Sequence, residues 1–418
     1  MKVLILIALL FTVVAASTAP LHNVDIGIHN EFLVIFNQNV TEFTVAQHIS
    51  SFKSIDGNSI AFVFKNTPGY AATLTPDTLA RVRQDPNVAF VEANQIVYGD
   101  VLVGENGKLK TEDPRKAVPC PNTQSNVPSW GLERLSVESA NQMNKEYHYY
   151  ENAGEGVNTY ILDTGVEITH PDFAGRAFWG FNSGSGPNTD RNGHGTHVAG
   201  TVAGTKYGIA KKATIYAVKV LGSKEEGAVP EATIFNVVAG IDWVTSHKKQ
   251  QGKPAVANMS LRTAFGTSPS TDRAMKDGYD AGVVYTSSSG NFNRDSCTQS
   301  PSNVPWGISV GATDVKDVRS SFSNAGTCTH VFGPGTAITS AWLNNGENTI
   351  SGTSMSSPHA AGVAALILGN NPSATPDEVK KIMQDESVKG AINLNCNANE
   401  VPSECIKSLN YLTHVPCS

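Results

Sequence analysis

The sequence predicts an α/β protein: a doubly wound, mostly parallel sheet with helices on both faces, preceded by a small α+β unit. From about residue 127 onward, strand-like and helix-like segments alternate, which is typical of a parallel sheet with crossover helices. The 418 residues suffice for one large and one small domain. With 40% hydrophobic and 16% charged residues, the composition indicates a compact globular protein and excludes a disordered chain.

The first 19 residues have the pattern of a secretory signal peptide. Lys2 precedes an apolar run from Val3 to Val14, and small residues follow, which places the cleavage between Ala16 and Pro20. The alternative, a membrane anchor, would need an apolar run of about 20 residues. We therefore expect a secreted protein, extracellular or in the lumen of the secretory pathway, with no membrane partner.

The next segment, residues 20–100, is expected to form the small α+β unit, called the front unit below. Its predicted strands cover residues 31–36, 59–64 and 88–98. A helix is predicted over residues 75–84, with Thr75 as N-cap and Pro76 in the first helical position. These segments alternate within some 80 residues, which favours a self-contained α+β domain.

Residues 99–126 show no periodicity and contain several Pro, Gly and Asn residues. We interpret this segment as a linker or exposed loop, with residues 101–126 as a processing region between the front unit and a main domain at 127–418.

The main domain shows regular alternation of the two element types. Its predicted strands lie at residues 156–163, 213–221, 255–261, 283–290 and 307–314. Its predicted helices lie at residues 195–204, 232–247, 270–282, 351–368 and 375–383. In the last helix Thr375 is the expected N-cap, and Glu378 completes a capping box. In such sheets the functional residues gather at the carboxyl ends of the strands.

Three motifs each place one reactive residue among small residues. Asp163 ends an apolar strand, His194 begins a Gly/Ala-rich helix, and Ser354 begins a helix that is apolar on all sides. Taken singly, each has an ordinary structural interpretation. Asp163 would be a turn residue, His194 a histidine with structural hydrogen bonds, and Ser354 a helix N-cap. Taken together, they are the three parts of an activated nucleophile, in which serine attacks, histidine takes its proton and aspartate orients the imidazole.

The order of the three residues along the chain separates two enzyme classes. In α/β-hydrolases the serine precedes the acid and the histidine, whereas here the order is Asp, His, Ser. The sequence around Ser354 also lacks the GxSxG pattern. A lipase or esterase is therefore disfavoured.

The stretches DTGV (163–166), HGTHVAG (194–200) and GTSMSSPHAAG (352–362) resemble those of subtilisin-like serine proteases of the proteinase K-like branch. The resemblance extends over nearly the whole chain after the signal peptide. It implies a subtilisin-like fold, a secreted serine endopeptidase acting on proteins and peptides, and Asp163, His194 and Ser354 as the triad. The same motifs contain His197 and His359. The resemblance implies that these two histidines are structural neighbours of the triad and are not catalytic.

The resemblance also assigns the oxyanion hole. The side chain of Asn291, in the stretch TSSSGN, stands at the position of the family's donor, beside the main-chain N–H of Ser354. The ordinary interpretation of Asn291 is a turn residue after a glycine.

Substrate is expected to bind as an added strand between exposed main-chain edges. By resemblance, the edges are Ser260, Leu261, Arg262 and Thr263; Ser288, Ser289 and Gly290; and the stretch from Gly227 to Val229. The chain departs from the family here, because SLRT replaces the usual SLGG. Two hypotheses follow: Arg262 narrows the groove, or it favours acidic side chains there.

The front unit resembles the inhibitory propeptide of the family. The resemblance implies that it assists folding of the main domain and then lays its C-terminal tail in the active site. The first cleavage is expected between Tyr98 and Val101, with a second trimming point at Pro114–Lys116. The alternative is a permanent accessory domain.

The six cysteines lack the CxxC spacing of structural zinc sites, and export favours disulfides. The resemblance implies a Cys297–Cys328 bridge. The other four cysteines allow three pairings, of which we favour Cys396 with Cys405 and Cys120 with Cys417.

No cofactor is expected for catalysis. A structural calcium ion is implied by the resemblance at Asp314, with the carbonyl oxygens of Pro305 and Gly307. The net charge of −6 argues against nucleic acid as a partner, and we expect a monomer. The competing functional hypothesis is a catalytically silent binding protein on a protease scaffold, held shut by its propeptide.

Overall fold

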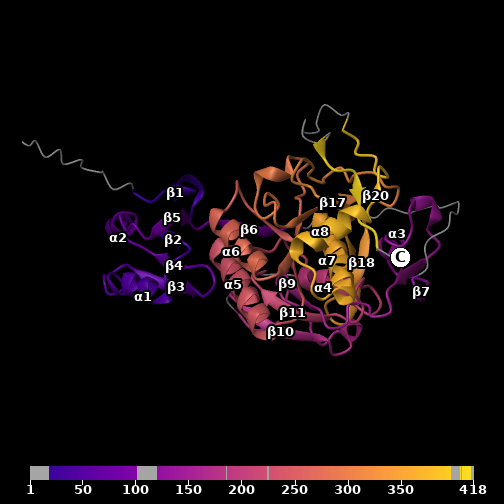
Figure 1. Ribbon diagram of the computed structural model, residues 1–418, viewed down its shortest axis with the longest axis horizontal. Coiled ribbons are helices and arrows are strands. Elements are labelled where there is room, and N and C mark those ends of the chain that lie inside the picture. The colour runs from indigo at the N-terminus through magenta and orange to yellow at the C-terminus, as the bar shows by residue number, and fades with distance from the viewer. Residues whose placement is uncertain are drawn as a thin grey trace, which may run out of the picture.

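The computed structural model describes residues 18–100, 120–184, 186–223, 226–396, 405 and 407–415. The predicted signal peptide, apart from its last two residues, and the first 19 residues of the predicted processing region lie outside the described residues. The chain forms a front unit and a larger body, which starts at residue 120 (Figure 1). None of the described helices is both long and apolar enough to span a bilayer.

The body is built on a nine-stranded sheet in the order β10-β11-β9-β13-β15-β16-β17-β21-β20. The strands, in that order, are Ala177–Asn182, Thr214–Lys219, Asn158–Asp163, Ala255–Met259, Val283–Ser288, Ile308–Thr313, Val331–Pro334, Tyr411–Leu412 and Val388–Lys389. Every neighbouring pair is parallel except β20 and β21. The predicted fold class is confirmed.

Helices cover both faces of this sheet. On one face, α4 (His194–Ala203) and α7 (Thr353–Asn370) pack against each other and against the central strands. On the other face lie α5 (Ile234–Gln251) and α6 (Pro269–Asp280). Helix α8 (Pro376–Asp385) packs beside α7 and begins with the predicted capping box. The arrangement is doubly wound, as the alternating elements predicted.

The start of α7 is tied to the strand beside it by an exchange of hydrogen bonds. Pro358 lies inside the helix and has no N–H to donate to the Ser354 carbonyl, four residues earlier. That carbonyl oxygen instead accepts from the Ser260 hydroxyl at 2.9 Å, just after the end of β13. Because of Pro358, the Ser354 carbonyl oxygen is available to accept this hydrogen bond. The bond connects the start of α7 to the carboxyl end of β13.

The start of α4 lies equally close to the sheet. A Cβ added at Gly195 would overlap the carbonyl oxygen of Gly165, in the turn after β9. The glycine therefore allows the first turn of the helix to approach the strand end that carries Asp163.

The front unit is a five-stranded sheet in the order β1-β5-β2-β4-β3. Its strands, from β1 to β5, are Leu21–His22, Glu31–Phe36, Ser59–Phe64, Gly69–Thr73 and Val88–Ala93. Helices α1 (Glu42–Ser50) and α2 (Pro76–Val82) pack on one face, and Thr75 caps α2 as predicted.

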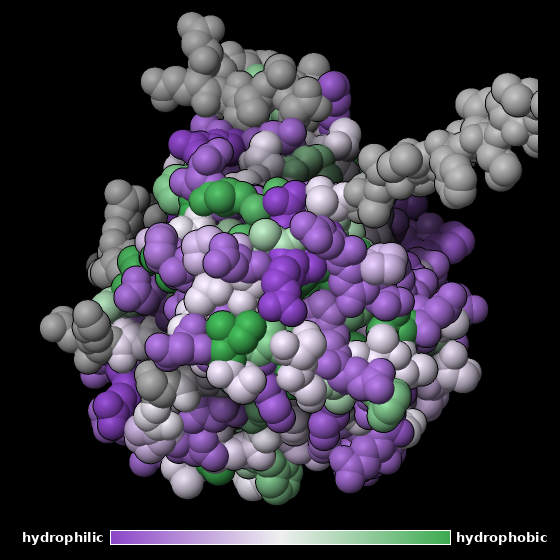
Figure 2. Space-filling model, turned by 90° about the vertical axis from the view of Figure 1, so that its left-hand side faces the viewer, coloured by the Kyte–Doolittle hydropathy of each residue, from purple (hydrophilic) through white to green (hydrophobic). Residues whose placement is uncertain are grey.

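The other face of the front sheet packs against the body. Leu33, Ile35, Phe64 and Ala71 belong to the same hydrophobic cluster as the apolar side chains of α5. Figure 1 shows the front unit resting on the α5 and α6 side of the body. Its outer face, in Figure 2, is largely polar, and the apolar residues there are scattered. The front sheet is therefore buried on both faces, once by its own helices and once by the body.

Polar contacts flank this apolar interface. The Asp242 carboxylate of α5 accepts from the main-chain N–H groups of Lys65 (3.0 Å) and Asn66 (2.6 Å) in the β3–β4 turn. Glu92 of β5 accepts from the Ser270 N–H at 2.8 Å, at the start of α6. Burial raises the pKa of Glu92, and its bond to Ser270 opposes the rise.

Two sequence predictions about the strands near residue 100 were wrong. The predicted strand 88–98 is two strands, because Asn94 and Gln95 interrupt it and β6 (Ile96–Gly99) leaves the front sheet for the body. The predicted linker also ends early, since β7 (Asn122–Ser125) pairs with β8 (Glu146–Tyr149). The residues of β7 are all polar, so no apolar alternation indicated a strand.

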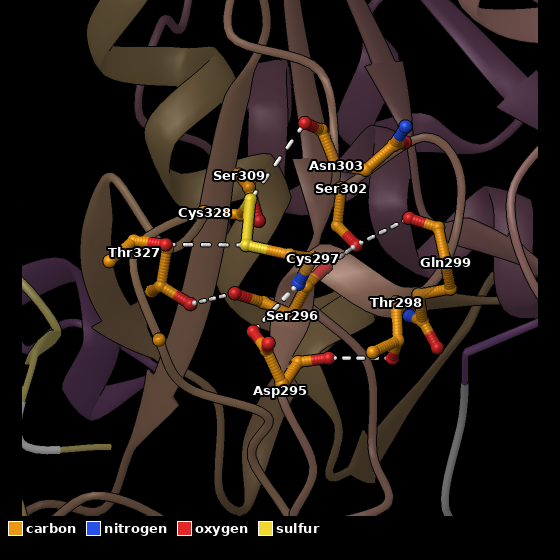
Figure 3. Close-up of a disulfide and its surroundings, with 12 residues drawn as sticks. Asp295, Ser296, Cys297, Thr298, Gln299, Ser302, Asn303, Ser309, Thr327 and Cys328 are labelled. Atoms are coloured by element: carbon orange, nitrogen blue, oxygen red, sulfur yellow. Dashed lines mark hydrogen bonds between the residues drawn. A yellow bond between two sulfur atoms is a disulfide. The ribbon is translucent and has the colours of Figure 1, made fainter. Parts of the chain in front are cut away.

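The disulfides hold surface loops of the body. A disulfide between Cys297 and Cys328 joins the loop after β15 to the loop before β17 (Figure 3). Cys396 is bonded to Cys405. Both predicted pairs are confirmed. Cys120 is also disulfide-bonded, and its predicted partner, Cys417, lies outside the described residues.

The approach of α4 to β9 yields a stability prediction. Gly195→Ala is expected to lower the free energy of unfolding by about 3 kcal/mol, because the new methyl group would lie 2.0 Å from the Gly165 main-chain oxygen. This cost exceeds the roughly 1 kcal/mol that alanine gains over glycine in a helix. Urea unfolding followed by tryptophan fluorescence measures the change.

The matched control is Gly184→Ala, where the added Cβ would have only a side-chain oxygen, 3.7 Å away, near it. The control should stay within about 0.5 kcal/mol of the parent. Equal effects of the two substitutions would contradict the close approach.

Candidate active site

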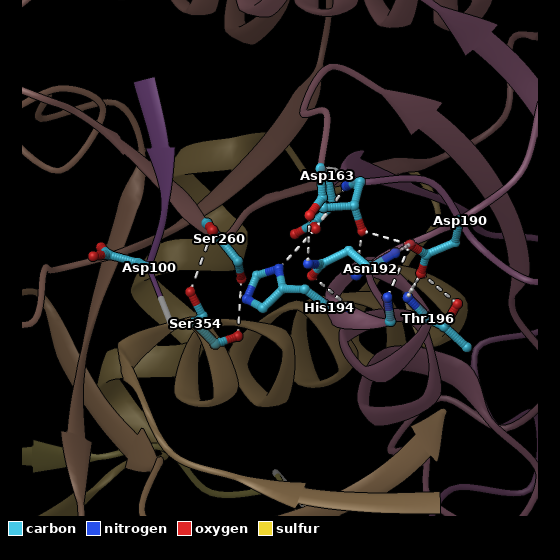
Figure 4. Close-up of polar contacts among 12 residues, drawn as sticks. Asp100, Asp163, Asp190, Asn192, His194, Thr196, Ser260 and Ser354 are labelled. Carbon is cyan, nitrogen blue, oxygen red and sulfur yellow. Dashed lines mark hydrogen bonds and ion pairs between the residues drawn. The ribbon is translucent and has the colours of Figure 1, made fainter. Parts of the chain in front are cut away.

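Three neighbouring parallel strands bring polar residues to one edge of the sheet. Asp163 ends β9, Ser260 directly follows β13, and Ser288 ends β15. His194 begins α4 and Ser354 lies in the first turn of α7, on the face where these helices pack together. Figure 4 shows the His194 imidazole between Asp163 and Ser354.

The Asp163–His194 pair fixes the protonation of the imidazole. Asp163 Oδ1 accepts from His194 Nδ1 and from the Thr164 main-chain N–H, both at 2.7 Å, and both side chains are buried. Because the carboxylate accepts from Nδ1, the lone pair of the neutral ring is at Nε2. Among the described residues, Nε2 has no hydrogen-bond partner, although it is buried.

The charge balance at His194 favours its protonated form. Burial of the ring works against the charge, but the carboxylates of Asp163, Asp190 and Asp100 outweigh it. The pKa of His194 is therefore raised above its ordinary value of 6.5. A base stabilised in this way can hold a proton between two steps of a reaction.

Asp190 is a site residue that the sequence analysis missed. Its Oδ1 accepts from the main-chain N–H groups of Asn192 and Gly193, both at 3.0 Å, and from the Thr164 hydroxyl at 2.9 Å. Its Oδ2 accepts from the N–H and hydroxyl of Thr196. The buried carboxylate thereby holds the loop before α4 against the end of β9. The available signal was an acidic residue five positions before the predicted helix start, shortly before Asn192 and Gly193.

Ser354 is the second residue of α7, and its hydroxyl does not cap the helix. The hydroxyl donates to the Ser260 carbonyl at 3.2 Å, while the Ser260 hydroxyl donates to the Ser354 carbonyl. Ser260 thus bonds both the hydroxyl and the carbonyl oxygen of Ser354 at the edge of the sheet.

The two further histidines have structural hydrogen bonds. His197 Nε2 donates to the Ile338 carbonyl at 3.0 Å, and His359 Nδ1 donates to the Met355 carbonyl at 2.7 Å. Burial lowers the pKa of His197 to about 3 and that of His359 to about 4. Both rings are therefore neutral at ordinary pH.

The orientation of the Asn291 side chain is settled by its neighbours. Its Oδ1 accepts from the main-chain N–H of Thr353 at 2.8 Å, a group that can only donate. The amide nitrogen therefore points the other way, where it donates to the carbonyl oxygen of Asp100 at 2.7 Å. A Cβ at Gly352 would stand 2.7 Å from the same carbonyl oxygen, so a glycine leaves room for it.

The tail of the front unit occupies the groove next to these residues. Strand β6 pairs antiparallel with β12 (Glu231–Thr233) on one side and with β14 (Leu261–Thr263) on the other. Beyond it, the Asp100 N–H donates to the Ser260 carbonyl at 3.2 Å. The segment predicted from Ser260 to Thr263 thus lies along the tail.

The second main-chain segment that borders the tail differs from the predicted segment. The Gly99 N–H donates to the Pro230 carbonyl at 2.9 Å, so the edge runs from Pro230 into β12 and not along Gly227–Val229. Gly227 instead donates its N–H to the Asn192 carbonyl, because its loop turns toward the start of α4.

The predicted segment Ser288–Gly290 forms the wall behind the tail. The Ser288 hydroxyl donates to the Asp100 carboxylate at 2.9 Å. The Ser289 hydroxyl donates to the Asn324 carbonyl, and the Gly290 N–H donates to the Thr353 hydroxyl. Of the three residues, only Ser288 makes a side-chain bond to the tail.

The groups predicted to bind calcium do not fit a calcium ion. The carbonyls of Pro305 and Gly307 accept from the Lys380 ammonium group at 2.6 and 3.1 Å. Asp314 Oδ1 accepts from the N–H groups of Lys316 and Val318 in its own turn. A calcium ion at the two carbonyls would have to displace a cation that the chain itself supplies. The described residues also contain no cluster of three or more His, Cys, Asp or Glu side chains arranged for a metal.

Comparisons with known proteins agree with this architecture. Residues 154–400 match the Subtilase family, and residues 36–100 match the Peptidase inhibitor I9 family. The chain is 36% identical over 379 residues to alkaline serine exoprotease A of Vibrio alginolyticus, covering 88% of this chain and 66% of that protein. It is also 36% identical over 369 residues to subtilisin-like protease 4 of Trichophyton rubrum, covering 85% of this chain and 86% of that protein.

A solved structure is similar as well. The crystal structure of a cold adapted subtilisin-like serine proteinase superposes with a TM-score of 0.62 at 38% identity, covering 70% of this chain and 99% of that chain. The chain therefore belongs to the subtilase family of serine proteases, and its front unit is an inhibitor I9 propeptide.

Proposed function

We propose that this chain is a zymogen that cleaves itself between Asp100 and Val101 and then acts as a secreted serine endopeptidase. The observation that carries the proposal is the position of the Asp100 carbonyl group. Its oxygen is bonded to Asn291 at the edge where the Asp163–His194 pair and Ser354 meet. A peptide bond held in this way is a substrate bond, since the oxygen that becomes negative already faces a donor.

The residues present are sufficient for acyl transfer. The Ser354 hydroxyl turns from the Ser260 carbonyl to the free Nε2 of His194 and gives up its proton there. Its oxygen attacks the carbonyl carbon of Asp100, and the negative charge on the Asp100 oxygen is met by Asn291 Nδ2 and by the Ser354 N–H. That N–H lies in the first turn of α7, where it has no acceptor within the helix and the helix dipole is positive.

The second half of the cycle returns the protons. The imidazolium of His194, stabilised by Asp163, protonates the leaving nitrogen of Val101 as the peptide bond breaks. Water then gives a proton to His194 and attacks the ester carbon, which frees the new carboxyl group of Asp100 and restores the Ser354 hydroxyl. The net reaction is hydrolysis of one peptide bond.

The same contacts support inhibition by the propeptide after cleavage. Strand β6 lies between β12 and β14 and excludes other peptides from the groove. The front unit is further held by the apolar interface with α5 and by Asp242. Activity therefore begins when the front unit is removed. Secretion is supported by the pattern of residues 1–19 and by disulfides that persist in oxidising compartments.

Self-cleavage is the first prediction of this mechanism. The parent chain, refolded by dilution from urea, should yield a fragment that ends at Asp100 and one that begins at Val101, which mass spectrometry identifies. Ser354→Ala should remain whole, because no nucleophile is present. Asn291→Ala should cleave about 10²–10³-fold more slowly, the loss known for removal of the oxyanion amide in subtilisin.

The control is Ser356→Ala, which removes another buried hydroxyl from the same turn of α7, one that donates to the Thr353 carbonyl. It should cleave like the parent. Cleavage of the Ser354→Ala chain at the same bond would contradict the mechanism. A parent that never cleaves itself, and never hydrolyses casein once the front unit is removed, would instead indicate the silent binding protein.

The rate of self-cleavage should rise with pH. His194 acts as a base only when neutral, and its pKa in the uncleaved chain is raised above 6.5 by neighbouring carboxylates, so its proton is lost only above that pH. Asp100→Asn removes one of these negative charges and should move the midpoint of the profile to lower pH. Initial rates between pH 5 and 9, followed by gel densitometry, measure both midpoints.

The comparison depends on the position of the midpoint and not on the maximal rate, which the substitution can also change. Identical midpoints for the two chains would show that Asp100 does not act on His194.

A further inference from the structure

The side chain of Asp100 lies in a pocket of its own. The residue is only 2% exposed, and its main chain is held by Ser260 and Asn291 on either side. Its carboxylate reaches the strand ends, where Oδ1 accepts from Arg262 Nε at 3.1 Å and Oδ2 accepts from the Ser288 hydroxyl at 2.9 Å. This pocket receives the residue that precedes the cleaved bond.

A pocket that buries a carboxylate must compensate for the loss of water around it. Burial raises the pKa of Asp100, and the Arg262 charge and the Ser288 hydroxyl oppose that rise. Each carboxylate oxygen has a donor, and one of the donors carries a full positive charge. Hydrogen bonds to charged groups are the stronger class in proteins. The pocket is therefore matched to an acidic side chain.

Arg262 is held in place independently of the carboxylate. Its NH1 group donates to the Thr263 carbonyl at 3.1 Å. Its guanidinium carbon lies 4.2 Å from the centre of the Phe292 ring and 5.4 Å from that of Tyr98. Phe292 and Thr263 belong to the body, so two of these supports remain when the tail leaves. The guanidinium is thus preorganised for the next substrate.

We infer that Arg262 and Ser288 form a carboxylate-binding subsite and that the mature enzyme cleaves preferentially after aspartate. The inference rests on the proposed protease function and specifies its substrate class. It decides between the two hypotheses for Arg262, because the side chain contacts an acid in the groove and does not close it. Glutamate fits less well, since one more methylene would carry its carboxylate past the two donors.

The test uses the mature enzyme and four chromogenic peptides. Each peptide has the sequence Val-Tyr-Gly-X-p-nitroanilide, which repeats residues 97–99, with X as Asp, Asn, Glu or Leu. The Asp peptide should have a kcat/KM at least about tenfold above that of its neutral isostere Asn. The Leu and Glu peptides should also be slower than the Asp peptide.

Arg262→Met should remove this preference. The substitution keeps an unbranched side chain but deletes the charge, so the Asp-to-Asn ratio should fall to about one while the Leu peptide is still hydrolysed. The matched control is Arg294→Met, because Arg294 is an exposed arginine whose guanidinium carbon also lies near the Phe292 ring, 5.7 Å from its centre, and makes no bond to Asp100. Its ratio should equal that of the parent.

Arg262→Met also removes the partner of Asp100 in the zymogen, so the variant is expected to mature slowly. In the double variant Asp100→Leu, Arg262→Met, an apolar side chain occupies a pocket that no longer carries a charge. This variant should cleave itself faster than either single variant. Single variants that both mature at the parental rate would overturn the inference.

The outcomes separate the inference from the function on which it rests. Fastest hydrolysis of the Leu peptide, with the same order in Arg262→Met, would overturn the aspartate preference and leave the protease function intact. Hydrolysis of no peptide, or equal hydrolysis by the Ser354→Ala chain, would overturn the function and the inference with it.

Discussion

The pairing of β6 with two strands of the body is the constraint on which the arrangement of the active site depends. Because β12 and β14 both bond to it, the tail cannot slide along either edge without breaking bonds on both sides. A shift of one residue would also reverse every side chain of the strand. The register therefore determines which carbonyl reaches Asn291 and which side chain meets Arg262. In the proposed mechanism, the same row of main-chain hydrogen bonds would determine both the side chain that is recognised and the bond that is cleaved.

The meeting of Asp163, His194 and Ser354 was predictable because these residues lie in short motifs at the ends of regular elements. Asp163 ends a strand, and His194 and Ser354 lie in the first turns of helices, in segments that the sequence predicts; parallel strands bring such ends together. The alternation of elements likewise predicted the sheet and its covering helices. Asn291 was assigned only through the family resemblance, since an asparagine after a glycine is otherwise typical of a turn.

The features that escaped prediction depend on partners far away in the sequence. Strand β7 is polar throughout and forms only because β8 lies beside it. The ammonium group of Lys380, in α8, donates to the carbonyl oxygens of Pro305 and Gly307, which lie more than 70 residues earlier in the sequence. These two oxygens were predicted to bind calcium. Asp190 binds donors on both sides of the α4 start, and no periodic pattern marks it. In each case the deciding interaction is a tertiary hydrogen bond that sequence spacing cannot display.

In the proposed zymogen, the shared burial of the front sheet would make activation irreversible. Leu33, Ile35, Phe64 and Ala71 are covered only while the front unit rests on α5. A front unit that left the body would expose this apolar face to water, which would weaken its fold and make it more accessible to proteolysis. In the proposed mechanism, a departing front unit would then be digested, and a small amount of free enzyme would suffice to spread activation to the remaining zymogen.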